Sequence, residues 1–148
     1  MDIYSSMERH GGNHGCILMD DSMKILLVDD DALIRKTMKD IFSCMNVHAI
    51  TASNGYEALD IACKEDITVA LIDLRMPGID GIETFKRLKR TKPTLKAFLI
   101  TTLVDDARSR EAINAGISGI IEKPFRVSTL VDALGIKDDK QCLNEIEN

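Results

Sequence analysis

Five short apolar runs, each followed by a segment with helical periodicity, constrain the fold of this chain most strongly. Runs of four or five apolar residues suit strands buried on both faces, as in parallel sheets. The predicted strands cover residues 24–28, 47–51, 69–72, 96–100 and 118–121. Strands that alternate with helices predict parallel βαβ units with right-handed crossovers. The sequence therefore predicts an α/β fold of three layers, with helices on both faces of one sheet.

Capping residues and glycines mark the ends of the predicted helices. Asn54 and Asp80 are candidate N-caps with an acid three residues later, a variant of the capping box. Gly116 and Gly135 are expected to end the last two helices. Spacings of three and four residues predict the apolar faces of the first and last helices. These faces are Ile34, Met38, Ile41 and Met45, and Val127, Leu130, Val131 and Leu134.

Length and composition fit one folded domain. The chain has 148 residues, of which 45% are hydrophobic and 29% charged, enough to bury a core. We expect a flexible leader at residues 1–22, a domain at 23–136 and a short tail at 137–148. No window approaches 18 apolar residues, so no membrane span is expected. The net charge of -5 argues against a nucleic-acid surface.

The cysteines and the N-terminus bear on the compartment. Four cysteines lie far apart with no C-x-x-C pair, and the N-terminus lacks the pattern of a secretion signal. We therefore expect reduced thiols and a cytoplasmic protein.

Polar side chains follow four of the five predicted strands. The third run ends on Asp73, and the loop after it contains one proline and two glycines. The other strand-end groups are Asp29, Asp30 and Asp31, Thr101 and Thr102, and Glu122 with Lys123. The carboxyl ends of parallel strands lie on one edge of the sheet. The fold is therefore expected to gather carboxylates, a hydroxyl and an ammonium in one pocket.

Such a cluster has a definite chemistry. Two carboxylates about 4 Å apart repel by roughly 4 kcal/mol at an effective dielectric near 20. A hard divalent cation relieves this repulsion, and oxygen ligands favour Mg²⁺. Lys123 adds a positive charge and Thr101 a hydroxyl donor. An oxygen nucleophile, a metal, a cation and a donor are the parts that phosphoryl transfer to a carboxylate requires.

Four motifs together resemble the receiver domain of bacterial two-component response regulators, the CheY-like family. They are Val28-Asp29-Asp30-Asp31, Leu71-Ile72-Asp73-Leu74-Arg75-Met76-Pro77-Gly78-Ile79-Asp80-Gly81, Leu99-Ile100-Thr101 and Glu122-Lys123-Pro124-Phe125. The resemblance covers about residues 23–134. It implies a doubly wound, flavodoxin-like sheet of five parallel strands in the order 2-1-3-4-5.

The resemblance also implies a role for each site residue. Asp73 would be the phosphoacceptor, Thr101 would hydrogen-bond the phosphoryl oxygens and Lys123 would pair with the phosphate. Mg²⁺ would be bound by Asp30 and Asp73, by Asp29 through water and by the backbone carbonyl of Arg75. The Lys123–Pro124 peptide bond would be cis, an uncommon isomer even at proline.

One switch position departs from the family pattern. Thr101 and Ile120 are the implied switch pair, but members often carry Tyr or Phe where this chain has Ile120. A β-branched side chain is stiff at χ1. We therefore expect any signal to pass mainly through loop and helix movement. Thr102 stands where many members have a small residue, and it is expected to narrow the mouth of the pocket.

The implied function is that of a signalling receiver in a phosphorelay rather than an enzyme, although it would assist its own phosphorylation and dephosphorylation. A histidine kinase or a histidine phosphotransfer protein would be the donor. The output would be a downstream protein or an output domain absent from this chain, with a phosphorylation-dependent dimer as a further option. Too few residues follow Phe125 for a DNA-binding module.

Two other functions compete with this interpretation. A degenerate receiver would act as a scaffold without being phosphorylated, but the acid, Thr and Lys set is complete. A haloacid-dehalogenase-type phosphohydrolase would use the D-x-D spacing of Asp29 to Asp31. Leu33 does not fit that family, and no strand-borne acidic pair follows Lys123.

The chain also contains a basic run between the third and fourth predicted strands. It comprises Lys86, Arg87, Lys89, Arg90, Lys92 and Lys96. A solvated helix face is the simpler interpretation, and contact with an acidic partner is the alternative.

Overall fold

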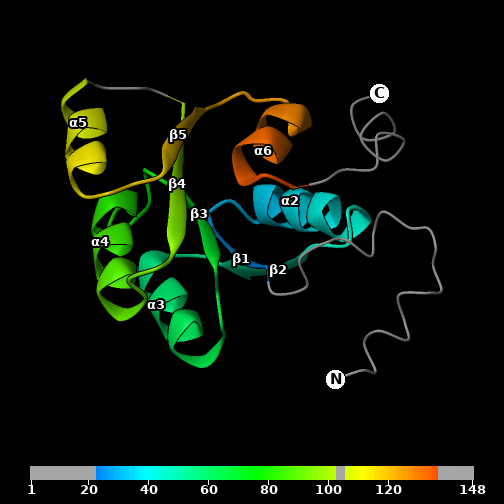
Figure 1. The fold of residues 1–148 in the computed structure, drawn as a ribbon, viewed down its shortest axis with the longest axis horizontal. Helices are drawn as coiled ribbons and strands as arrows, with labels where there is room; N and C mark the ends of the chain where they lie inside the picture. The colour runs from blue at the N-terminus through cyan, green and yellow to red at the C-terminus, as the bar shows by residue number, and fades with distance from the viewer. Residues whose placement is uncertain (1–22, 103–105, 137–148) are drawn as a thin grey trace.

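The computed structural model describes residues 23–102 and 106–136, in which strands and helices alternate (Figure 1). The strands are β1 (Lys24–Val28), β2 (His48–Ala52), β3 (Val69–Asp73), β4 (Lys96–Thr101) and β5 (Gly119–Glu122). The helices are α2 (Ala32–Cys44), α3 (Gly55–Lys64), α4 (Gly81–Thr91), α5 (Asp106–Asn114) and α6 (Val127–Leu134). The predicted leader, 1–22, and tail, 137–148, lie outside the described residues.

The sheet has the predicted order and direction. Its strands run β2-β1-β3-β4-β5, and every neighbouring pair is parallel. The predicted α/β fold is thereby confirmed. β2 begins one residue later than predicted because the Val47 N–H donates to the Phe42 carbonyl at 2.9 Å and still belongs to the turn that ends α2. β5 is also displaced by one residue, since Glu122 pairs with Thr101 of β4.

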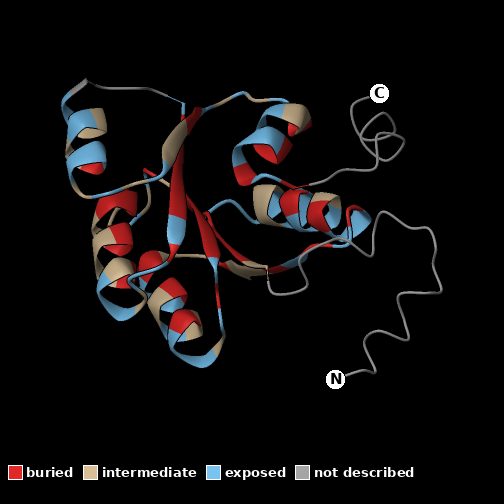
Figure 2. Cartoon of the chain, in the orientation of Figure 1, coloured by how far each residue is buried: buried red, intermediate tan, exposed pale blue. Residues whose placement is uncertain are grey.

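The sheet separates two apolar cores. Figure 1 shows α2 and α6 on one side of the sheet and α3, α4 and α5 on the other. Side chains alternate along each strand: Leu27 and Leu71 point to the first core, and Leu26 and Ile72 to the second. Figure 2 shows the central strands almost wholly buried. Both faces are covered, which explains why these strands are continuous apolar runs.

The predicted helix faces are largely observed, with one omission in α2. Val127, Leu130, Val131 and Leu134 of α6 are all buried, as predicted. Met38 and Met45 are buried, whereas Ile34 and Ile41 are only partly so. Phe42, which the prediction left out, is fully buried in the same core.

The predicted caps are present in modified form. Asn54 Oδ1 accepts from Glu57 N at 2.8 Å, and Asp80 Oδ1 accepts from Glu83 N at 2.9 Å. In a capping box the acid at the third helical position accepts from the N–H of the N-cap residue itself. At the Asn54 cap, Glu57 Oε1 instead accepts from Ser53 N at 2.7 Å, one residue before the cap.

Two further findings concern the membrane and the cysteines. Within the described residues, no helix has the length and apolar character needed to cross a bilayer. Cys63 is free and exposed. Cys44, exposed at the end of α2, is disulfide-bonded, which corrects the expectation of a reduced thiol at that position, whereas Cys63 agrees with it. Sequence spacing could not reveal this, because it does not show which thiols the fold brings together.

Candidate functional site

Strand register brings the predicted polar residues to one edge of the sheet. Val28 of β1 pairs with Ile72 of β3, so Asp29 and Asp73 are the next residues on adjacent strands. Asp73 in turn pairs with Ile100 of β4, which places Thr101 one step beyond. The edge therefore carries groups from all three central strands.

Three carboxylates converge there. Oxygen atoms of Asp29, Asp30 and Asp73 lie within 4.8 Å of one another. Asp29 is only 3% exposed, Asp73 is partly buried, and Asp30 is open to solvent. A set of carboxylate oxygens with one open side is suited to a hard divalent cation. The cluster could hold a metal ion through these three residues.

Lys123 supplies the positive charge of the edge. Its Nζ lies 3.4 Å from Asp29 Oδ2 and 3.9 Å from Asp73 Oδ1. The Lys123 N–H donates to the Thr101 carbonyl at 2.7 Å, which ties the end of β4 to the residue after β5. The Lys123–Pro124 bond is cis, as the family resemblance implied.

The environment of Asp73 opposes its ionisation. Burial is the main cause that raises the pKa of this carboxyl group, and the nearby Asp29 charge adds to it. Lys123 and a hydrogen bond from the Arg75 backbone N–H act in the opposite direction. Burial and the neighbouring Asp29 carboxylate therefore both disfavour the charged form of Asp73, and a bound cation would favour it.

Asp29 is held by contacts that the sequence did not reveal. Its N–H donates to the Ala52 carbonyl at 3.1 Å, and its Oδ1 accepts from Asp31 N at 2.9 Å. Its carbonyl accepts from Arg35 Nη1 at 2.7 Å. Arg35 lies one turn after Asp31, the N-cap of α2. Helical side chains tilt toward the N-terminus, and this tilt is the signal that could have identified Arg35.

Gly81 permits the close approach of α4 to the end of β3. A Cβ atom at Gly81 would lie 2.5 Å from the Asp73 carbonyl oxygen and 2.8 Å from Leu74 Cα. The Gly81 N–H donates to the Leu74 carbonyl at 2.9 Å. The Asp-Gly pair at the start of α4 therefore fixes the loop that follows Asp73, a role that the sequence analysis did not assign.

The remaining predicted residues lie around the edge. Thr101 is buried at the end of β4, and Thr102 beside it is exposed. Arg75 is exposed in the loop after β3. Ile120 lies in β5, partly buried against the core that α3, α4 and α5 cover.

The fold and the acidic edge define a flavodoxin-like α/β protein with its polar site at the carboxyl ends of the strands. Residues 25–135 match the family described as the response regulator receiver domain. The chain belongs to this family, and it is a receiver domain of two-component systems. Receiver domains are signalling domains.

Three comparisons illustrate the relationship. Sporulation initiation phosphotransferase F of Bacillus subtilis is 33% identical over 111 residues, which cover 75% of this chain and 90% of that protein. The structure of Vibrio cholerae CheY4 superposes with a TM-score of 0.73 at 29% identity, over 76% of this chain and 96% of the other. The BeF3-activated receiver domain of DrrB gives a TM-score of 0.67 at 26% identity, over 82% and 97% of the chains.

Proposed function

We propose that Asp73 accepts a phosphoryl group and that this modification switches the signalling surface of the domain. The observation that carries the proposal is the position of the Asp73 carboxylate at the strand edge. It lies beside the carboxylates of Asp29 and Asp30, and its Oδ1 is 3.9 Å from the Lys123 ammonium. An oxygen nucleophile beside a potential cation site and a fixed positive charge is the arrangement that phosphoryl transfer requires.

Mg²⁺ is the cation that the donor set favours. Asp29, Asp30 and Asp73 would hold it, and the backbone carbonyl of Arg75 would contribute a further oxygen. Carboxylate, carbonyl and water oxygens are the ligands of Mg²⁺. When bound, the metal would neutralise charge on the transferring phosphoryl oxygens.

The chain's own residues would act as follows. An Asp73 carboxylate oxygen attacks phosphorus, the P–N bond of a donor phosphohistidine breaks, and the imidazole leaves with its other nitrogen protonated. Lys123 would pair with the phosphoryl oxygens, and the Thr101 hydroxyl would donate to them. The same groups would assist the later attack of water that removes the phosphoryl group. The product carries about 1.5 to 2 negative charges in place of the single charge of the carboxylate.

A histidine kinase or a histidine phosphotransfer protein would be the donor, and the output would pass through contacts with another protein or domain. A cytoplasmic location is part of the proposal. The disulfide at Cys44 argues against a cytoplasmic location, because disulfides are rare in the reducing cytosol. Thiol trapping in intact cells therefore tests whether Cys44 is oxidised there, which bears on the compartment.

Intact mass after incubation with acetyl phosphate tests the proposed chemistry. We expect a Mg²⁺-dependent gain of one phosphoryl group in the wild type and none in Asp73→Asn. No gain in the wild type, with folding intact, would indicate a scaffold that is not phosphorylated. An adduct that persists in Asp73→Asn but requires Asp29 would favour the hydrolase alternative. Asp29→Asn is therefore measured beside Asp73→Asn.

A further inference from the structure

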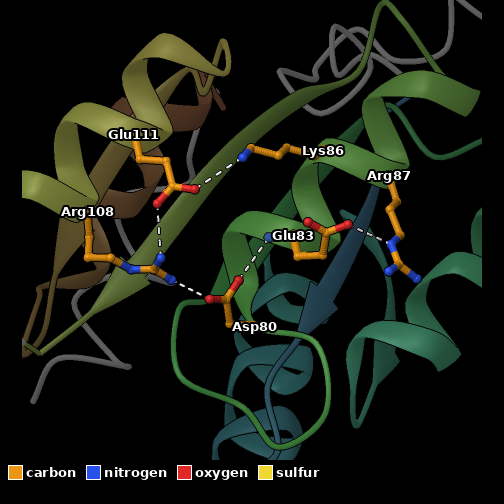
Figure 3. A network of polar contacts seen from close by, with 6 residues as sticks. All are labelled: Asp80, Glu83, Lys86, Arg87, Arg108 and Glu111. Carbon is orange, nitrogen blue, oxygen red and sulfur yellow. Dashed lines mark hydrogen bonds and ion pairs between the residues drawn. The ribbon is translucent and has the colours of Figure 1, made fainter.

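A network of ion pairs connects α5 to α4 and to the loop after Asp73 (Figure 3). Asp80 takes part twice, because Oδ1 caps α4 and Oδ2 pairs with Arg108 Nη2. Glu111 bridges the two helices: Oε1 accepts from Arg108 Nη1 at 3.0 Å and Oε2 from Lys86 Nζ at 3.1 Å. We call Asp80, Lys86, Arg108 and Glu111 the α4–α5 clamp.

The apolar contact beneath the clamp is small. Among the α5 side chains that the structure describes, only Ala112 is buried, and Ile113 is 61% exposed. An open groove of about 580 Å³ runs along α4 and α5, lined by Lys86, Ala107, Arg110, Glu111, Asn114 and Ala115. A helix with one small buried side chain is weakly held by the hydrophobic effect. Polar contacts therefore contribute an unusual share of what keeps α5 in place.

The two segments that carry Asp80 and Arg108 both follow strands that end at the edge containing Asp73. Asp80 ends the loop that begins at Asp73. Arg108 lies in the first turn of α5, which follows closely after Thr101. A displacement of either segment at the edge changes the distance between Asp80 and Arg108.

We propose that the α4–α5 clamp stabilises the unphosphorylated position of α5 and that phosphorylation of Asp73 releases it. The proposal rests on the proposed function of Asp73. A phosphoryl group adds charge at the edge and draws Thr101 and Lys123 toward it, so the start of α5 shifts relative to Asp80. Linkage then requires the reverse effect: loosening the clamp must favour the phosphorylated form by the same factor.

Beryllium fluoride with Mg²⁺ is the probe, since it mimics a phosphoryl group on a carboxylate without turnover. NMR titration at low ionic strength gives the half-saturating beryllium fluoride concentration for wild type and Arg108→Gln. We expect this concentration to fall about threefold to fivefold in the variant, the size of effect that partly exposed ion pairs support. Without beryllium fluoride, amide exchange in α5 should be faster in Arg108→Gln by a similar factor.

Arg87→Gln is the matched control. Arg87 pairs with Glu83 at 2.8 Å within α4, at nearly the same exposure as the clamp residues, but does not reach α5 in this network. It should leave both measurements unchanged. Asp80→Asn gives a second variant, because Asn also serves as an N-cap while the charge is lost. The effects of Asp80→Asn and Arg108→Gln should be non-additive in the double mutant.

The outcomes separate the clamp from the underlying function. An unchanged or weaker affinity in Arg108→Gln, with normal binding by the wild type, would overturn the clamp alone. If the wild type binds no beryllium fluoride and gains no phosphoryl group from acetyl phosphate, the proposed function and the clamp both fall. If Arg108→Gln does not fold, Glu111→Gln breaks the same network from the other side and replaces it.

Discussion

Helices α4 and α5 lie on the same side of the sheet, but they are held in different ways. α4 buries Ile82, Phe85 and Leu88 in the core. α5 buries only Ala112 among its described side chains, and its connection to α4 is a network of partly exposed charges. Burial of large apolar groups resists displacement, whereas surface ion pairs contribute little each and weaken in salt.

Because they are held differently, the two neighbouring helices differ in how easily they can be displaced. α4 is fixed, and its first turn carries the Asp80 cap at the end of the loop from Asp73. α5 belongs to the class of weakly held elements from which moving parts of proteins are drawn. The signal proposed to begin at Asp73 would therefore displace α5 with little disturbance of the core beneath α4.

The largest effect is expected from Phe85→Ala in α4. Phe85 is 1% exposed, and truncation of a buried phenylalanine costs about 3–5 kcal/mol through lost transfer energy and the cavity left behind. Urea unfolding followed by circular dichroism measures the free energy of unfolding. A loss below about 1 kcal/mol would show that α4 is not the anchored helix of the pair.

A smaller effect, opposite in sign, is expected from Asp73→Asn at the edge that both helices flank. Because the folded state raises the pKa of Asp73, the folded state binds its proton more readily than the unfolded state. Stability therefore falls as pH rises from the ordinary carboxyl pKa through the folded value, and the penalty is fully present above it. Without metal at pH 7, Asp73→Asn should melt about 3 °C higher than wild type.

The pH dependence provides the control for that variant. The difference in melting temperature should disappear in acid, where the Asp73 carboxyl group is protonated in both states. Mg²⁺ should raise the melting temperature of the wild type more than that of Asp73→Asn, because the variant has lost one carboxylate. A wild type that is the more stable of the two at pH 7 without metal would contradict the prediction.

The smallest effect is expected from Ile113→Ala in α5. Ile113 is one of the largest apolar side chains on the surface, yet its truncation leaves no cavity. Such surface substitutions change the free energy of unfolding by about 0.5 kcal/mol or less. The same urea experiment as for Phe85→Ala measures it. A loss comparable with that of Phe85→Ala would remove the contrast between the two helices.

The elements of the fold were predictable because each leaves a periodic signal. The alternation of apolar runs and helical faces identified every strand to within one residue, and the family resemblance supplied the strand order. Phe42 was missed because both Ile41 and Phe42 lie at helical steps from Met38, of three and four residues, and the predicted face included only Ile41. The Asp29, Asp30, Asp73 and Lys123 cluster was predictable since each residue follows a strand.

The contacts that the sequence could not supply are pairings between polar residues far apart in the chain. Lys86 belongs to the basic run that was interpreted as a solvated helix face, yet it pairs with Glu111 of α5. Arg87 satisfies that interpretation better, because its partner Glu83 is on the same helix. Nothing in the local pattern distinguishes these two residues. Only the placement of α5 over α4 decides which one becomes part of a connection between helices.

The sheet that separates the two cores has a consequence for how this domain can diverge in evolution. Leu27 and Leu26 are neighbours in β1 but belong to different compartments. Substitutions in compartments without shared contacts combine nearly additively. The α3–α4–α5 side can therefore accumulate changes that suit a new partner without compensating changes beneath α2 and α6. One half of the molecule can specialise while the other preserves the stability on which both depend.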